Sequence, residues 1–197
     1  MSPVLGLTGS LCSGKTTALR VFQKKGASVF DTDELVHRYF KKKNSVVYKK
    51  ISENFPEAIE EGGICRLKLR NIVFSDYKKL KKLEEIVHPV VIEELKRWIE
   101  KERNKGGVAV AEVPLLFEKN LAGLFDKVIL IYAPLEQLKE RIRDKYKLSP
   151  DEVLKRLRLF SSLEEKMRKS DFVIKNDADF FRLEKEIDKI WERVKRG

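Results

Sequence analysis

Cysteine and histidine are scarce in this chain of 197 residues, which contains two of each. The cysteines, Cys12 and Cys65, have no paired spacing, so we expect neither a disulfide framework nor a zinc site. The histidines, His37 and His88, have no metal-ligand pattern beside them. A chain without disulfides is typical of a reducing compartment, and we expect the cytoplasm.

Long apolar runs are also missing from the sequence. No run approaches the ~20 apolar residues that a membrane span needs, so no membrane partner is expected. Residues 2–11 are too few for a signal peptide and lead straight into a glycine-rich loop. We find no internal repeat and no low-complexity linker, and the length is typical of one domain with insertions.

Acidic residues are outnumbered by basic ones, 31 to 42, which gives a net charge of +11 and a pI near 9.5. This balance indicates an anionic partner, either a nucleic acid or a small polyphosphate. Basic and aromatic residues do not alternate in any tract, so nucleic acid ranks second. We expect small-molecule substrates, no nucleic acid, and a monomer or weak homo-oligomer.

A phosphate-binding motif stands near the N-terminus. Residues 9–17 read GSLCSGKTT and fit the pattern G-x-x-x-x-G-K-[ST]. An apolar run precedes the motif, and a helical pattern follows it, which is the context that the motif requires. The alternative is a glycine-rich turn between a strand and a helix that binds nothing.

Each part of this loop has a physical role in binding ATP. Gly9 and Gly14 permit backbone angles at which successive N–H groups point at phosphate oxygens. Lys15 is expected to reach the β- and γ-phosphates, and the Thr16 hydroxyl to bind Mg²⁺. The residues that we expect to bind ATP here are Cys12, Ser13, Gly14, Lys15, Thr16 and Thr17.

Strand and helix patterns alternate along the chain. Short apolar runs predict five strands, at residues 4–7, 27–30, 108–113, 127–132 and 172–174. Strands that alternate with helices predict an α/β fold with a parallel sheet. The last helix is expected to place one apolar stripe on that sheet, formed by Phe180, Leu183, Ile187, Ile190, Trp191 and Val194.

A long helical stretch interrupts this alternation. From residue 34 to 103 the pattern is helical, with expected breaks at Pro56, at Gly62 and Gly63, and at Pro89. A crossover between parallel strands needs far fewer residues, so the stretch predicts an insertion with its own role. The expected organisation is a nucleotide-binding core (residues 1–33, 106–140 and 159–197), a helical acceptor-binding insertion (34–105) and a lid (141–158).

Carboxylates follow two of the predicted strands. Asp31 and Asp33 come after the second strand, and Glu112 ends the third. Because binding sites in parallel sheets form at the carboxyl ends of the strands, these groups are expected to meet the phosphate loop. Asp33 is the better candidate for accepting a proton from an attacking hydroxyl, whereas Asp31 is as readily a helix cap. Glu112 either helps to hold Mg²⁺ or makes a capping or ionic contact.

The two histidines have both structural and functional interpretations. His37 lies four residues after Asp33, so the two share a helix face, and we favour a substrate contact over a structural hydrogen bond. His88 precedes Pro89 and is expected to cap a helix boundary.

A dense cationic stretch lies between the fourth and fifth strands. It contains Arg141, Arg143, Lys145, Lys147, Lys155, Arg156 and Arg158. One interpretation is a solvated helix face. The other is a kinase lid that brings one or two arginines over the phosphates, which we favour.

Taken together, the sequence resembles the dephospho-coenzyme A kinase family along nearly its whole length. The resemblance rests on the phosphate loop and on DTD at residues 31–33 with His37, Arg66, HP at 88–89, PLLFE at 114–118, EK at 165–166, and Asn176 after VI at 173–174. PLLFE is the most specific of these. Cys12 departs from the family's usual glycine, and Glu112 from the commoner aspartate.

The resemblance implies a P-loop kinase fold and transfer of the ATP γ-phosphoryl group to the ribose 3′-hydroxyl of dephospho-coenzyme A. It implies Asp33, Lys15 and Arg141 as catalytic residues, with Arg143 as the alternative lid arginine. It also implies that Arg156 and Asn176 contact ATP. The implied acceptor site contains Asp33, His37, Arg66 and His88.

Two other functions are compatible with parts of the sequence. The nearer is another small-molecule kinase of the same architecture, acting on a nucleoside monophosphate or a shikimate-like acceptor; the large insertion and PLLFE argue against it. The other is an RNA-binding GTP switch, against which the sequence has no Asn-Lys-x-Asp segment.

Overall fold

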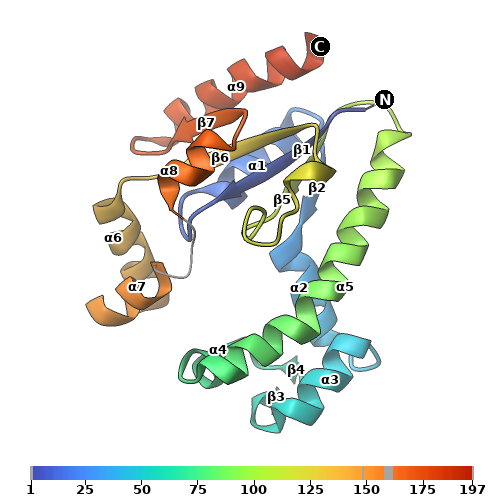
Figure 1. The fold of residues 1–197 in the computed structure, drawn as a ribbon, viewed down its shortest axis with the longest axis vertical. Helices are drawn as coiled ribbons and strands as arrows, with labels where there is room; N and C mark the ends of the chain where they lie inside the picture. Colours follow the sequence, from blue (N-terminus) through green and yellow to red (C-terminus); the bar gives the residue numbers. More distant parts are fainter. Residues whose placement is uncertain (1, 148, 158–161, 197) are drawn as a thin grey trace. The chain divides into compact units, whose positions relative to one another are not determined.

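Five strands between residues 4 and 175 form one parallel sheet (Figure 1). The computed structural model describes residues 2–147, 149–157 and 162–196. The strand order is β2-β5-β1-β6-β7, with every neighbouring pair parallel. The strands are β1 (Val4–Gly9), β2 (Ser28–Asp31), β5 (Ala109–Glu112), β6 (Lys127–Tyr132) and β7 (Phe172–Lys175). The predicted parallel α/β fold is therefore confirmed.

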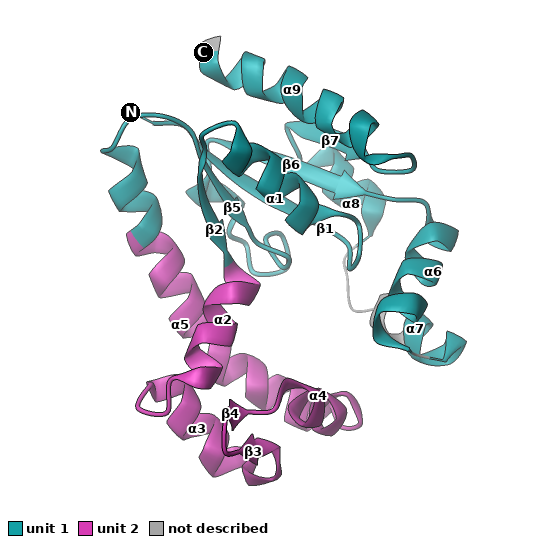
Figure 2. Cartoon of the chain, turned by 180° about the vertical axis from the view of Figure 1, so that it is seen from behind, with its two compact units in different colours: residues 1–31, 98–197 teal, residues 32–97 magenta. Residues whose placement is uncertain are grey.

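Helices α1 (Lys15–Lys24) and α9 (Phe180–Arg196) cover one face of this sheet (Figure 2). Their apolar residues join side chains of β1 and β6 in one core, and all six residues of β1 are buried. Burial on both faces explains why residues 4–7 of β1 form a continuous apolar run instead of alternating with polar residues. The predicted stripe of α9 is buried at Leu183, Ile187 and Trp191, but Phe180 is exposed, so the stripe begins one turn later than expected.

The opposite face of β1 is packed by the segment that follows β5. Leu116 and Phe125 lie so close to Gly6 that a Cβ there would come within 2.9 Å of both side chains. This segment contains the short helix η2 (Ala122–Leu124), and helix α8 (Leu163–Arg168) precedes β7. Gly6 therefore allows residues around Leu116 to lie against the strand that leads into the phosphate loop.

The predicted lid region is helical. Helices α6 (Leu135–Tyr146) and α7 (Pro150–Leu157) pack on each other and bury Leu138, Ile142 and Val153 in a small core. A serine and a glutamate cap the start of α7, because the Glu152 carboxylate accepts hydrogen bonds from the Ser149 N–H and hydroxyl.

Residues 32–97 form a second compact unit, and residues 1–31 and 98–197 form the first (Figure 2). The predicted insertion had the bounds 34–105. The second unit contains α2 (Thr32–Lys41), α3 (Val46–Asn54), η1 (Pro56–Ala58), β3 (Ile59–Glu60), β4 (Gly63–Ile64), α4 (Arg66–Phe74) and most of α5 (Tyr77–Arg103). Its core includes Ile51, Phe55 and Leu69.

Two expectations for this stretch were wrong. Pro89 lies inside α5, so no helix boundary falls there and His88 caps none. Proline in a helix interior costs ~3 kcal/mol, but Ile86 and Val87 on its N-terminal side are buried in the core, and burying such side chains returns ~1.5–3 kcal/mol each. The stretch also contains a small antiparallel pair, β3 with β4, that was not predicted.

None of the helices in the described residues is long and apolar enough to cross a bilayer.

Candidate active site

The loop between β1 and α1 is shaped by two glycines at positive φ. A Cβ at Gly9 would lie 2.0 Å from the carbonyl oxygen of Ile131, and φ there is 152°. Gly14 has φ 103° and stands directly before the first residue of α1. Neither conformation suits a side chain, so the two glycines of the motif are required by the fold of the loop itself.

The loop holds its own lysine in place. The Lys15 ammonium donates a hydrogen bond to the carbonyl oxygen of Ser10 at 2.9 Å, and Lys15 is 7% exposed. The Ser13 N–H also donates to the Ser10 carbonyl oxygen, at 3.2 Å. The positive end of the α1 dipole adds to the lysine charge at the same point, which favours an anion.

A hydroxyl and a carboxylate meet beside this loop. The Thr16 hydroxyl lies 3.3 Å from Oε1 of Glu112, which is 3% exposed. Glu112 is the last residue of β5 and is in register with Leu7 of β1 and Asp31 of β2. The sheet thus brings Glu112 to the phosphate loop and sets Asp31 beside it, as expected from the carboxyl ends of parallel strands.

Two oxygen ligands of this kind fit Mg²⁺, which commonly takes one or two protein oxygens and completes its shell with phosphate oxygens and water. Among the described residues, no cluster of three or more His, Cys, Asp or Glu side chains forms a metal site. A Mg²⁺ ion bound to the nucleotide fits the oxygens of Thr16 and Glu112.

Three cations act on Cys12, in the middle of the loop. Burial raises the pKa of the Cys12 thiol, and the charges of Lys145, Lys15 and Arg141 act in the opposite direction. Cys12 itself has a left-handed backbone, with φ 58°. Side chains from α6 therefore add positive charge to the loop, which strengthens its attraction for polyphosphate.

Arg141 is fixed on the same side of the sheet as the loop. Its guanidinium donates to the carbonyl oxygen of Asn176 at 3.1 Å and to Oε1 of Gln137 at 3.2 Å. Arg143 is exposed and bonds to the adjacent Asp144. Arg156 belongs to α7, but its side chain lies outside the described part of the structure, as do residues 158–161.

Asn176 contacts the phosphate loop directly. Its side-chain nitrogen donates to the carbonyl oxygen of Ser13 at 2.8 Å. A Cβ at Gly14 would lie 2.2 Å from that same nitrogen. The structure thus brings Asn176 to Ser13 and Gly14, two other residues predicted for ATP binding, whereas Thr17 is exposed on α1.

Sequence reasoning missed a buried ion pair near this edge. The Lys166 ammonium lies 2.7 Å from Oε1 of Glu118, and the Lys166 side chain is only 2% exposed. Glu118 ends the PLLFE segment, which begins where the Pro114 carbonyl accepts a hydrogen bond from the Thr8 hydroxyl. The PLLFE and EK motifs lie far apart in the sequence, and only their joint presence in the resemblance suggests that they meet.

The four residues predicted for the acceptor all belong to the second unit. Asp33 and His37 lie one turn apart on α2, as expected; Asp33 is exposed, and the His37 Nδ1 is buried without a hydrogen-bond partner among the described residues. Arg66 is the exposed first residue of α4. His88, inside α5, has its Nδ1 3.9 Å from a carboxylate oxygen of Glu84.

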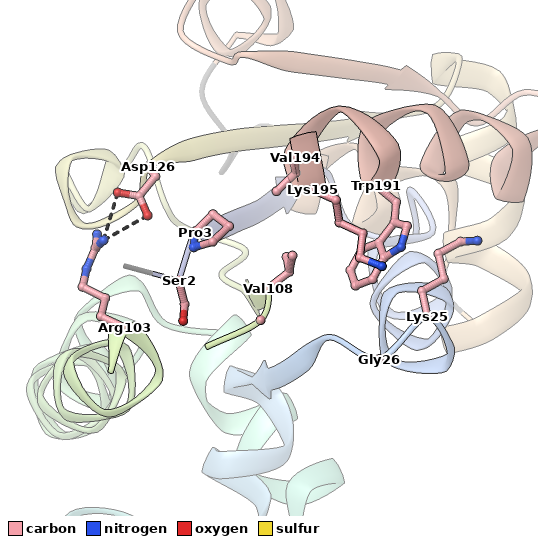
Figure 3. A pocket seen from close by; sticks show the side chains of 11 residues that line it. Ser2, Pro3, Lys25, Gly26, Arg103, Val108, Asp126, Trp191, Val194 and Lys195 are labelled. Carbon is pink, nitrogen blue, oxygen red and sulfur yellow. Dashed lines mark hydrogen bonds and ion pairs between the residues drawn. The ribbon is translucent and has the colours of Figure 1, made fainter. Parts of the chain in front are cut away.

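A cavity of about 850 Å³ lies at the other edge of the sheet (Figure 3). Pro3 precedes β1, Val108 precedes β5 and Asp126 precedes β6, so the cavity is at the amino ends of the strands. The Asp126 carboxylate there accepts from Arg103 and from the Val4 N–H. This carboxylate holds the start of β1 in place. The cavity is separate from the site at the carboxyl ends of the strands.

Comparison with known proteins identifies close relatives. A family model described as dephospho-CoA kinase matches residues 3–181. A dephospho-CoA kinase of Aquifex aeolicus is 37% identical over 194 residues, covering 98% of this chain and 97% of the relative.

Solved structures agree with this similarity. A structure from Thermus thermophilus is 33% identical, with a TM-score of 0.76, and covers 98% of this chain and 97% of its own. A dephospho-CoA kinase from Campylobacter jejuni is 27% identical, with a TM-score of 0.74, and covers 100% of this chain and 99% of its own.

Proposed function

The chain belongs to the dephospho-CoA kinase family, whose reaction is the ATP-dependent phosphorylation of dephospho-CoA that completes CoA synthesis, and we propose that this chain phosphorylates the ribose 3′-hydroxyl. The observation that carries the proposal is the structure of the phosphate loop. Its Lys15 ammonium is hydrogen-bonded to the Ser10 carbonyl, and the Thr16 hydroxyl is hydrogen-bonded to Glu112. These groups provide for a triphosphate and its metal at the carboxyl edge of the sheet.

In the proposed reaction, O3′ of the acceptor attacks the γ-phosphorus. The O3′–P bond forms, the bond from the γ-phosphorus to the β,γ-bridging oxygen breaks, and ADP leaves. The hydroxyl proton passes to the Asp33 carboxylate. Two peptide steps separate Asp33 from Asp31, so their Cα atoms are at most about 7.6 Å apart. Asp33 thus follows closely on the strand end at which Asp31 is the register partner of Glu112, which supports its choice as the base.

The protein's contribution to this transfer is mainly positioning and charge. Loop N–H groups and Lys15 hold the β- and γ-phosphates, and Arg141 is the proposed lid arginine that neutralises charge on the moving phosphoryl group, with Arg156 as a second ATP contact. Thr16 and Glu112 would hold Mg²⁺, which supplies further charge neutralisation when bound. His37, Arg66 and His88 are proposed to contact the acceptor.

Two broader expectations also remain proposals. The lack of paired cysteines supports action in the reducing cytoplasm. A monomer or a weak homo-oligomer is the expected state, since the site is proposed to be built from one chain.

The position of transfer can be tested directly. The chain is incubated with ATP, Mg²⁺ and dephospho-CoA, and the product is analysed by phosphorus NMR; a matched reaction uses the 3′-deoxy analogue. We expect a new 3′-phosphomonoester from dephospho-CoA and none from the analogue, which should still compete with the substrate. Phosphorylation of the analogue, or a 2′-phosphate in the product, would overturn the assignment.

A further inference from the structure

We propose that Asn176 is a positioning residue that sets the shape of the phosphate loop from outside it, without touching the nucleotide. The inference deepens the proposed function, because it rests on the loop being the binding site for the ATP phosphates. It replaces the direct ATP contact that the resemblance implied for this residue.

Asn176 makes two hydrogen bonds that join the sheet to the phosphate loop. Its N–H donates to the carbonyl oxygen of Tyr132 at 2.7 Å, which continues the pairing of β7 with β6. Its side-chain nitrogen donates to the carbonyl oxygen of Ser13 at 2.8 Å. The strand ladder therefore fixes the backbone of Asn176, and the fixed side chain reaches across to the loop.

The Ser13 carbonyl belongs to the same peptide unit as the Gly14 N–H. A trans peptide is planar, and its C=O and N–H point in opposite directions. By holding the carbonyl outward, Asn176 turns the Gly14 N–H the other way. In loops of this class the inward N–H groups bind phosphate oxygens, so the asparagine controls one of the binding groups at a distance.

Gly14 makes this close approach possible. Any side chain there would place a Cβ 2.2 Å from the Asn176 nitrogen, in a backbone with φ 103°. Glycine is thus favoured at position 14 for two reasons. Its φ is unfavourable for residues with a side chain, and a Cβ there would clash with the Asn176 side chain.

Asn176 is held in turn by α6. Arg141 donates to the Asn176 carbonyl oxygen at 3.1 Å, and Gln137 donates to that of Asp177 at 3.2 Å. A continuous chain of hydrogen bonds therefore runs from α6 through Asn176 to the phosphate loop. Asn176 thus contacts both α6, which carries the proposed lid arginine, and the loop that is proposed to bind the phosphates.

Inorganic tripolyphosphate distinguishes bracing from a direct contact with adenosine. Binding of tripolyphosphate, ATP and adenosine is measured by calorimetry without an acceptor, for the wild type, Asn176→Ala and Asn176→Asp. The aspartate variant keeps the size of the side chain but sets a carboxylate oxygen against the Ser13 carbonyl. A matched control is Asn104→Ala, which removes an asparagine that donates to the Glu100 carbonyl at 3.1 Å outside the loop.

Both Asn176 variants should bind tripolyphosphate and ATP about tenfold more weakly, which corresponds to ~1.4 kcal/mol, with the aspartate the weaker. The affinity for adenosine and the melting temperature should stay at the wild-type values. The Asn104→Ala control should bind all three ligands as the wild type does. Unaltered tripolyphosphate binding in a folded variant, or an equal loss of adenosine binding, would overturn the inference. Because neither turnover nor acceptor enters the readout, its failure is distinguishable from failure of the proposed reaction.

Discussion

Asp31 and Asp33 are two residues apart in different surroundings. Asp31 ends β2 and is half-buried in register with Glu112, whereas Asp33 is exposed in the first turn of α2. An exposed carboxylate can meet an incoming hydroxyl, so Asp33→Asn should lower kcat by roughly 10²–10⁴, the usual contribution of a general base. ATP affinity and the melting temperature should change little, since the amide keeps the size of the side chain.

The matched control for this prediction is Asp31→Asn. Steady-state kinetics of the two variants should give a large loss for Asp33 and a smaller one for Asp31. Nearly full activity of Asp33→Asn beside an inactive Asp31→Asn would mean that the wrong aspartate has been assigned.

Thr16 offers a second test at the residue scale. Its hydroxyl lies 3.3 Å from a Glu112 oxygen, and Thr16→Val removes that oxygen while keeping the branched shape. We expect the Mg²⁺ concentration for half-maximal activity to rise, because a metal ligand has been lost. Ser52→Ala, which removes a surface hydroxyl of α3 that donates to the Lys49 carbonyl, is the control. A Thr16→Val enzyme with the Mg²⁺ dependence of the wild type would remove Thr16 from the metal site.

Some residues of the site can be predicted from the sequence, and others cannot. Gly9, Gly14, Lys15 and Thr16 are predictable because the loop is encoded within a few consecutive residues. The bond from Asn176 to Ser13 joins positions 163 residues apart, and no local pattern encodes such a contact. Arrangements of this kind depend on strand order and register, which only the folded sheet determines.

Helix α6 carries the clearest test at the scale of elements. Arg141 is half-buried and contributes to the field at Cys12, whereas Arg143 is exposed and paired with its neighbour. If α6 and α7 act as a lid, Arg141→Ala should lower kcat at least a hundredfold; arginines in this role are worth roughly 10³–10⁵. Arg156→Ala, in α7, tests the second proposed arginine.

Lys139→Ala is the control on the same helix, since its ammonium pairs with Glu136 on the surface, where single charges contribute little. Turnover and melting temperature are measured for all variants, with Arg143→Ala included to test the alternative register. Uniformly mild effects would mean that these helices present a charged surface and do not form a lid.

Elements of the first unit could be predicted more completely than those of the second. Apolar runs such as that of β6 identify buried strands, and a glycine such as Gly26, at φ 96° just after α1, is a common signal for the end of a helix. In the second unit local signals were misleading at Pro89, because packing of α5 outweighs the cost of a proline. The pair of two-residue strands β3 and β4 is too short to give any alternation.

At the scale of the whole molecule, the chain divides its proposed tasks between two compact units. The first contains the phosphate loop, Glu112 and the α6–α7 pair, and the second contains Asp33, His37 and the other proposed acceptor residues. The net charge of +11 suits two substrates that both carry phosphate groups. Nucleotide binding is thus proposed for the first unit and acceptor recognition mainly for the second.

The most direct test of this account is the choice of acceptor. ATP consumption is measured with Mg²⁺ and, separately, dephospho-CoA, AMP, CMP and shikimate, and kcat/KM is compared among the four. We predict that dephospho-CoA is phosphorylated far faster than the other three. Equal or better turnover of AMP, CMP or shikimate would contradict the assignment of this chain as a dephospho-CoA kinase.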